Sequence, residues 1–161
     1  MIIFCGLISF PVAVNAWYTY TIQLSQYWAA DSGKHLDWSG SSKYVSQFRM
    51  AVNKWNSYKS GVIREDFWNT VNDLKIYDVE YISSGVVART SANTGKMEFA
   101  TRYMDGYNSA QKQNVCIYEL GYALGLAHRN ESDSVMQEIV TSIIILSEGD
   151  KRNYDEAYKR Y

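Results

Sequence analysis

Residues 115–136 (VCIYELGYALGLAHRNESDSVM) contain the side chains whose types and spacing could perform catalysis. Tyr118 and Tyr122 are four residues apart, so a helix places them on one face, with Glu119 beside the first of them. His128 follows a glycine-led turn. Two helical ligands and a third ligand delivered after a turn make a three-ligand zinc site, and a neighbouring glutamate then acts as the general base.

The residue types at positions 118 and 122 conflict with that chemistry. A neutral imidazole binds zinc well at neutral pH, whereas a phenol has a pKa of about 10 and keeps its proton. We therefore expect two phenols in place of two imidazoles to weaken zinc binding severely. The other histidine of the chain, His35, lies in an N-terminal loop, where a surface role is the simpler interpretation.

The segment resembles the zinc-binding consensus of the metzincins, and of their matrixin (matrix-metalloprotease-like) branch in particular. That consensus reads H-E-x-G-H-x-L-G-L-x-H, and the methionine of the Met-turn follows eight residues later. The matching residues here are Glu119, Gly121, Leu124, Gly125, Leu126, His128 and Met136. Only the first two histidines differ, because Tyr118 and Tyr122 stand in their places.

The resemblance extends over about residues 17–161. It implies a zincin-like α+β domain with a twisted mixed sheet, an active-site helix, a Met-turn and a C-terminal helix. It also implies a metallopeptidase domain in which Glu119 is the catalytic base and His128 is a zinc ligand. Tyr118 and Tyr122 then mark the positions of two lost ligands, so zinc binding is expected to be weak or lost.

The resemblance further implies how a substrate would bind. A strand over residues 96–101 would form the upper rim of the cleft, where an extended peptide adds by main-chain hydrogen bonds. Residues 85–90 would lie nearby, and the loop after Met136 (QEIVTSIII) would wall the specificity pocket. No acidic loop clusters its carboxylates strongly enough to predict a structural calcium site.

Three hypotheses follow from the two tyrosines. The chain is a degenerate protease that keeps the fold, has lost the metal and binds peptides or proteins in its cleft. Alternatively, it is an active zinc endopeptidase with unusual ligation. In the third hypothesis it is a mutated variant of an active protease, because a single base change converts histidine to tyrosine. In the first hypothesis the two phenol hydroxyls bond Glu119, His128 or water.

The hydrophobic pattern predicts one domain that contains both helices and strands. Apolar residues recur at helical spacing over residues 43–58, which Gly61 ends, and Asn108 or Ser109 begins a second helix that Gly125 ends in a left-handed conformation. Ser147 begins a final helix. Strands are predicted over residues 17–24, 75–81, 85–90 and 96–101, with a turn at 93–95 and a polar loop at 33–42, where Ser41 or Ser42 caps the next helix.

The ends and the composition limit the classes of protein. Residues 1–16 are apolar and close on a small-x-small pattern, which predicts a signal peptide, a secreted domain over 17–161 and no membrane span in the mature chain. The formal net charge of −1 and the lack of a basic patch argue against nucleic-acid binding. Cys116 is then the one remaining cysteine, expected to be a small buried hydrophobe, and we expect a monomer.

Overall fold

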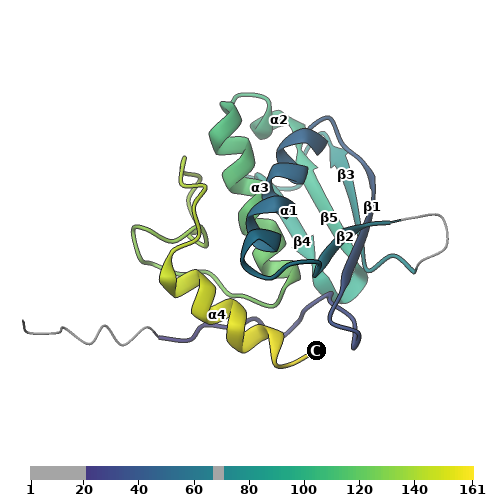
Figure 1. Ribbon diagram of the computed structural model, residues 1–161. Coiled ribbons are helices and arrows are strands. Elements are labelled where there is room, and N and C mark those ends of the chain that lie inside the picture. The colour runs from purple at the N-terminus through teal and green to yellow at the C-terminus, as the bar shows by residue number, and fades with distance from the viewer. Residues whose placement is uncertain (1–20, 67–70) are drawn as a thin grey trace, which may run out of the picture.

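The computed structural model describes residues 21–66 and 71–161, and it contains a five-stranded mixed sheet with helices packed against it (Figure 1). The predicted signal peptide at residues 1–16 lies outside the described residues. The strand order is β2-β1-β3-β5-β4. The strands are β1 (Leu36–Ser41), β2 (Ile63–Glu65), β3 (Leu74–Val79), β4 (Ala88–Ser91) and β5 (Lys96–Ala100).

The direction of each strand decides which edge can accept another chain. Neighbouring strands from β2 to β5 are parallel, and only β4 is antiparallel, because a tight connection joins it to β5. That connection is the short 3-10 helix η1 (Ala92–Thr94) and Gly95, whose φ of 62° is left-handed. The predicted turn at 93–95 is therefore confirmed, and β4 forms one edge of the sheet.

Two long helices pack against each other and against the sheet. They are α1 (Val45–Tyr58) and α3 (Ser109–Ala123), and a short helix, α2 (Thr101–Met104), precedes α3. Phe48 of α1 meets Trp38 of β1 edge-on, with ring centroids 4.7 Å apart. Trp55 of α1 is fully buried and donates from its indole nitrogen to the carbonyl of Ile117 in α3, at 3.0 Å. These contacts fix the height of α3 above the sheet.

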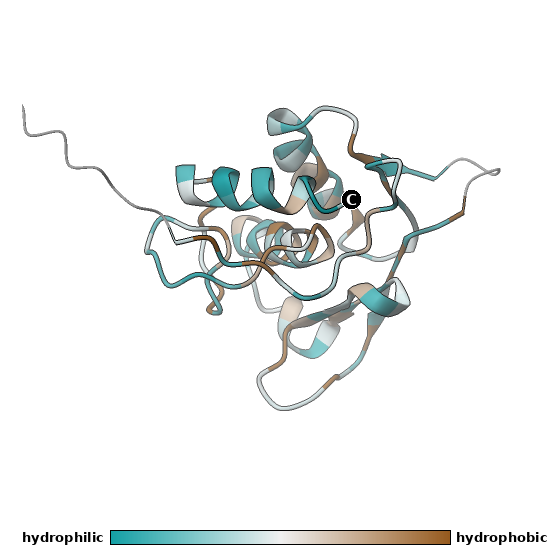
Figure 2. Ribbon diagram, turned by 90° about the horizontal axis from the view of Figure 1, so that it is seen from below, coloured by the Kyte–Doolittle hydropathy of each residue, from teal (hydrophilic) through white to brown (hydrophobic). Residues whose placement is uncertain are grey.

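The last helix, α4 (Glu148–Tyr158), is hydrophilic along most of its length (Figure 2). Its attachment is correspondingly polar, because Asp150 and Asn153 are both fully buried. Asn153 accepts a hydrogen bond from the N–H of Gln23 in the N-terminal segment. That segment runs beside the end of α3, where the N–H of Ala29 donates to Ala123. Within the described residues, no helix is both long and apolar enough to cross a membrane.

One of the predicted elements is wrong, and another lies partly outside the described residues. Residues 33–42 do not form a loop throughout, because β1 occupies Leu36–Ser41 and lies inside the sheet. The polar residue Asp37 makes this strand hard to recognise from the sequence, and in the structure it is buried and paired with Arg64. Of the predicted strand at 17–24, residues 21–24 are described, and there Leu24 forms an isolated bridge to Leu126.

The helix starts agree better with the sequence. Asn108 caps α3 and Ser147 caps α4, each through a reciprocal capping box. Gly125 has a φ of 88°, as predicted for a residue that ends a helix. In contrast, neither Ser41 nor Ser42 caps α1, because Tyr44 is the N-cap residue and makes no side-chain cap. The short elements β2 and α2 were not predicted.

Candidate active site

Tyr118 and Tyr122 are only partly buried, unlike the other residues of α3 from Gln113 to Ala123. Their rings pack edge to face with centroids 5.0 Å apart, and the Tyr118 hydroxyl lies 3.4 Å from that of Tyr122. The two phenols therefore share one face, as the four-residue spacing predicts. Burial and the neighbouring hydroxyl of Tyr122 raise the pKa of Tyr118 above its ordinary value, so Tyr118 keeps its proton.

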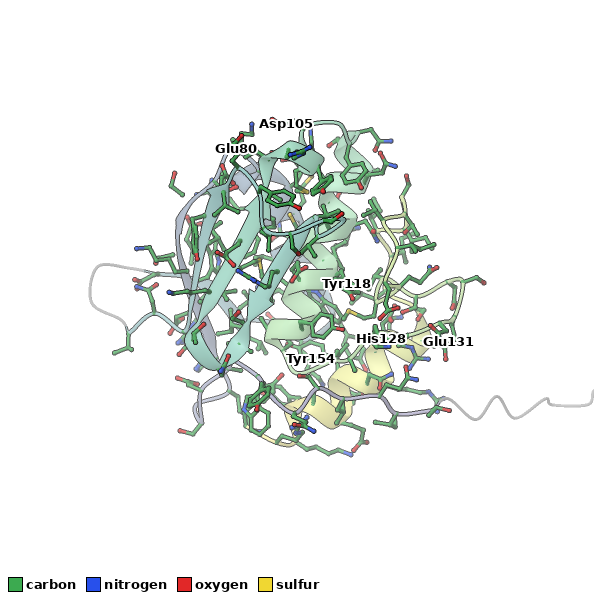
Figure 3. The ribbon with its side chains drawn as sticks, turned by 180° about the vertical axis from the view of Figure 1, so that it is seen from behind. Glu80, Asp105, Tyr118, His128, Glu131 and Tyr154 are labelled. Carbon is green, nitrogen blue, oxygen red and sulfur yellow. The ribbon has the colours of Figure 1, made fainter. Side chains whose placement is uncertain are left out.

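A tight turn after α3 brings His128 back to the two tyrosines. The N–H of Gly125 donates to Tyr122 and that of Leu126 to Gly121, so the chain reverses within one helical turn. His128 Nδ1 then lies 3.3 Å from the Tyr122 hydroxyl. Figure 3 shows the labelled side chains of Tyr118 and His128 close to each other beside α3. Three of the positions predicted to face a metal are thus brought together.

The predicted Met-turn is held by α4. The N–H of Arg129 donates to the carbonyl of Met136 at 2.7 Å and closes the loop between them. Asp150 accepts hydrogen bonds from the Ser134 hydroxyl at 2.5 Å and from the N–H of Val135 at 3.0 Å. All three of these residues are essentially inaccessible to solvent. The shape of the turn therefore depends on a buried carboxylate.

The position of the Met136 side chain explains why residue 121 is a glycine. A Cβ atom at Gly121 would overlap the sulfur of Met136 and would lie 3.2 Å from a ring carbon of Trp55. Glycine is thus the residue that lets the methionine pack directly beneath α3. Both residues are fully buried, and their contact lies on the inner side of the helix, away from the two tyrosines.

Glu119, the predicted base, is buried and faces the edge strand β4. Desolvation raises the pKa of its carboxyl to about 7, while hydrogen bonds from the side chain and the backbone N–H of Thr90 act in the opposite direction. The Thr90 hydroxyl also lies 3.2 Å from the Glu119 carbonyl oxygen. Within the described residues, the Glu119 carboxyl has no ion-pair partner and no hydrogen bond to either phenol. The sequence analysis did not identify Thr90, which nothing local marks.

Glu138 is a second site residue that the sequence did not reveal. It lies two residues after Met136, and its carboxylate oxygen Oε1 is 3.4 Å from His128 Nδ1. The side chains of both residues are about half exposed or more, at 64% and 46%. Its only signal in the sequence is its place in the loop that follows the Met-turn.

A cleft of about 330 Å³ opens in front of Glu119. One wall is the segment 85–88 that leads into β4, and the opposite wall is the loop 137–140. Asn114, Val115 and Tyr118 of α3 form its floor with Glu119. The loop after Met136 therefore does wall a cleft beside the candidate base, as the resemblance implied.

The prediction that the strand at residues 96–101 forms the rim of the cleft is wrong, because the neighbouring strand β4 lies at the edge of the sheet. β5, which covers Lys96–Ala100, pairs with β3 on one side and β4 on the other, so it has no free edge. The free edge belongs to β4. Because Val87 accepts from Ala100, the backbone groups of Ala88 and Thr90 point away from β5. Thr90 turns its N–H toward Glu119, which leaves Ala88 facing the cleft.

The residues of this site do not fit zinc. In the part of the chain that the structure describes, no group of three or more His, Cys, Asp or Glu side chains is placed to hold a metal ion. Both helical positions carry phenols, and burial keeps the proton on Tyr118. His35 does not compensate, because it lies before β1, where its N–H donates to Asp31.

Comparison with known proteins supports the fold. No family model and no curated protein matches the sequence. The crystal structure of archaemetzincin from Methanopyrus kandleri is similar, with a TM-score of 0.61 over 81% of this chain and 99% of that chain. The sequence identity is 9%, so the likeness concerns the fold alone. The chain therefore has a mixed α+β, metzincin-like fold.

Proposed function

We propose that this chain is a secreted, matrixin-like metzincin domain that has lost its zinc site and binds extended peptides or unfolded protein segments. The observation that carries the proposal is the pairing of Tyr118 and Tyr122 at the two helical ligand positions, beside an intact cleft. The function is then a binding function, such as that of a decoy, an inhibitor or a module of a larger system.

The loss of proteolysis follows from the state of the candidate base as well as from the metal ligands. Glu119 is directed at Thr90 of the edge strand, whereas a general base needs a water molecule within hydrogen-bond reach. A pKa of about 7 would suit a base, and this favours the alternative of an active zinc endopeptidase. The donor set opposes that alternative, because His128 is the single imidazole in the group.

The cleft offers the groups that an extended peptide needs. Among the described residues, the backbone groups of Ala88 at the free edge of β4 have no partner, which supports the addition of a strand. Val86, Val115 and Ile139 supply apolar surface in the cleft below that edge. Such surface can take one side chain of a peptide held against β4, and we propose that the domain does so as a monomer.

Metal content is the measurement that tests the loss of zinc. We expect the purified protein, after dialysis against micromolar zinc and desalting, to hold far less than one zinc ion per chain and to leave casein uncleaved. The double variant Tyr118→His/Tyr122→His supplies the missing imidazoles and should bind zinc. One tightly bound zinc per wild-type chain, together with cleavage that a chelator abolishes, would reject the proposal in favour of the active enzyme.

Peptide binding needs a separate test, for which the loop after the Met-turn offers a matched pair. Ile139 and Ile145 are 68% and 73% exposed, but only Ile139 lines the cleft. With reduced, carboxymethylated casein as the probe, we expect saturable binding that Ile139→Asp weakens at least about tenfold. Ile145→Asp should leave binding unchanged. Equal binding by the two variants would show that the cleft is not the binding surface.

A further inference from the structure

Four donor atoms form a row, which we call the donor row, and two of its residues, Tyr118 and Glu138, also line the cleft. Tyr118 Oη lies 3.4 Å from Tyr122 Oη, which lies 3.3 Å from His128 Nδ1. The same nitrogen is 3.4 Å from Glu138 Oε1. These spacings are longer than good hydrogen bonds between such groups, so the row is loosely held by its own contacts. Its members come from both α3 and the loops on either side of the Met-turn.

Glu138 places a carboxylate at one end of the donor row. It acts on Tyr118 electrostatically, in the direction expected of a nearby negative charge. Among the described residues, the Glu138 carboxylate pairs with no lysine or arginine. The nearby Arg129 is buried and engaged elsewhere, with Glu131 at 2.7 Å and with the carbonyl of Thr21. A cation would complete the electrostatics of the donor row.

The spacing of the donor row matches the distances between ligands of one metal ion. Two ligand atoms that each lie about 2.0 Å from a metal are about 3.3 Å apart at the tetrahedral angle and about 2.8 Å apart at a right angle. The three spacings between neighbouring members, 3.3 to 3.4 Å, lie at or just above the upper end of that range. Neighbouring members are therefore close enough in pairs to share one ion, and the side chains would close around it on binding.

The chemical types of the donor atoms determine which metal ion the donor row would prefer. Phenolate and carboxylate oxygens are hard, anionic donors, and tyrosinate serves as an iron ligand in other proteins. Divalent zinc is a poor match because it cannot easily displace two phenol protons, whereas the higher charge of a trivalent ion can. We propose that the donor row is a binding site for a ferric ion. The poor fit of these donor atoms to zinc then reflects a preference of the site for a different metal ion.

Proton balance gives the site a pH dependence. Each phenol that binds the ferric ion releases one proton to solvent, and the oxidation state of the iron does not change. Iron binding is therefore expected to strengthen as the pH rises, because fewer protons compete for the same oxygens. The pair of phenolates and the carboxylate of Glu138 would supply three negative charges to a trivalent cation.

Ferric nitrilotriacetate is the probe for this site. Protein stripped of metal with a chelator is incubated with it and desalted, and iron is then measured per chain with the visible spectrum. We expect about one ferric ion per chain and a visible phenolate-to-iron charge-transfer band, because phenolate ligands produce such a band. No retained iron, or retained iron without the band, would overturn the proposal, and the latter would mean an adventitious ion only.

Substitutions test whether the charge-transfer band comes from the tyrosines of the donor row. Tyr118→Phe/Tyr122→Phe keeps both rings and removes the two oxygens, and we expect it to abolish the band and weaken iron binding at least about tenfold. Tyr27→Phe changes an exposed tyrosine outside the donor row and serves as the matched control. If the double variant unfolds by circular dichroism, resonance Raman spectra of the wild-type protein decide the matter through tyrosinate vibrations. A band that survives in the double variant overturns the proposal.

The ferric site stands independently of the peptide-binding proposal. Casein binding and the Ile139→Asp variant test the cleft without any metal, whereas the charge-transfer band tests the donor row without any peptide. The variant Tyr118→His/Tyr122→His links the two metals, since it should lose the band and gain zinc. A variant that gained zinc and kept the band would show that the iron lies elsewhere.

Discussion

The inner and outer sides of α3 are held in opposite ways. On the inner side, Gly121, Met136 and Trp55 are fully buried and packed so closely that a single Cβ atom has no room. On the outer side, Tyr122 and His128 are partly exposed and meet at 3.3 Å. The inner side thus determines where the helix lies, and the outer side determines what it can bind.

This difference separates the contacts that hold the fold from the positions predicted to bind a metal. The Met-turn is fixed by hydrogen bonds to Asp150 and by the packing of Met136 under Gly121. None of these contacts involves a residue at a ligand position. A change of side chain at positions 118 and 122 would therefore alter the outer side and leave the packing of the inner side unchanged.

The largest expected effect comes from Asp150→Ala. This change leaves three donors without their acceptor, namely the Ser134 hydroxyl and the N–H groups of Val135 and Ser147. Buried donors without partners cost about 1–3 kcal/mol each, so we expect a loss of about 4 kcal/mol in the free energy of unfolding, measured by urea titration. Asp133→Ala, in an exposed position of the same loop, should cost less than about 0.5 kcal/mol. Equal effects would contradict the role given to α4.

The second effect is a dependence of stability on pH that originates in Glu119. Its pKa of about 7 in the folded protein exceeds its value of 4.5 in the unfolded chain, so the folded state holds the proton more tightly. Its contribution is fully present below about pH 4.5 and is lost as the pH rises through about 7, by about 3 kcal/mol in total. Urea titrations of metal-free protein at several pH values measure the loss. Glu119→Gln should flatten this part of the profile, and an unchanged profile would reject the assignment.

The third effect tests the close packing of the inner side directly. Gly121→Ala places a methyl group against the Met136 sulfur and Trp55, and such overpacking costs about 2 kcal/mol. Gly106→Ala is the matched control, because its nearest neighbour beyond the chain itself is the Tyr103 carbonyl at 3.6 Å. Thermal unfolding should separate the two variants by several degrees. If the two variants melt together, Met136 is free to move aside.

Much of this architecture could be predicted from local sequence. The helices α3 and α4 begin at capping residues, Asn108 and Ser147, which reach only three residues along the chain. The strand β1 could not be recognised, because Leu36 and Trp38 are its only apolar residues and Asp37 between them is neutralised by Arg64, 27 residues away. The buried charge is acceptable only after the sheet has formed, so no local pattern announces it.

The residues of the site likewise include some that local sequence predicts and some that it does not. Tyr118, Tyr122 and His128 could be grouped from spacing, because a helix and one turn fix their relation. Thr90 and Glu138 could be predicted only as members of longer segments, residues 85–90 and the loop after Met136, because the partner of each side chain depends on how an element folds back from elsewhere. The interior position of β5 was also unpredictable, since strand order depends on pairing across the whole sheet.

The smallest effect is expected at the outer side, and it makes the contrast with the interior quantitative. Tyr122→Phe removes a hydroxyl whose contacts are 3.3 and 3.4 Å long and partly exposed, so we expect less than about 0.5 kcal/mol. Tyr44→Phe provides the comparison, because the hydroxyl of that buried residue donates to Asp105 at 2.7 Å, and its removal should cost about 1 kcal/mol. Urea titrations of the two metal-free variants measure the difference. A larger loss at Tyr122 than at Tyr44 would mean that the outer side supports the fold, and the division between packing and chemistry would fail.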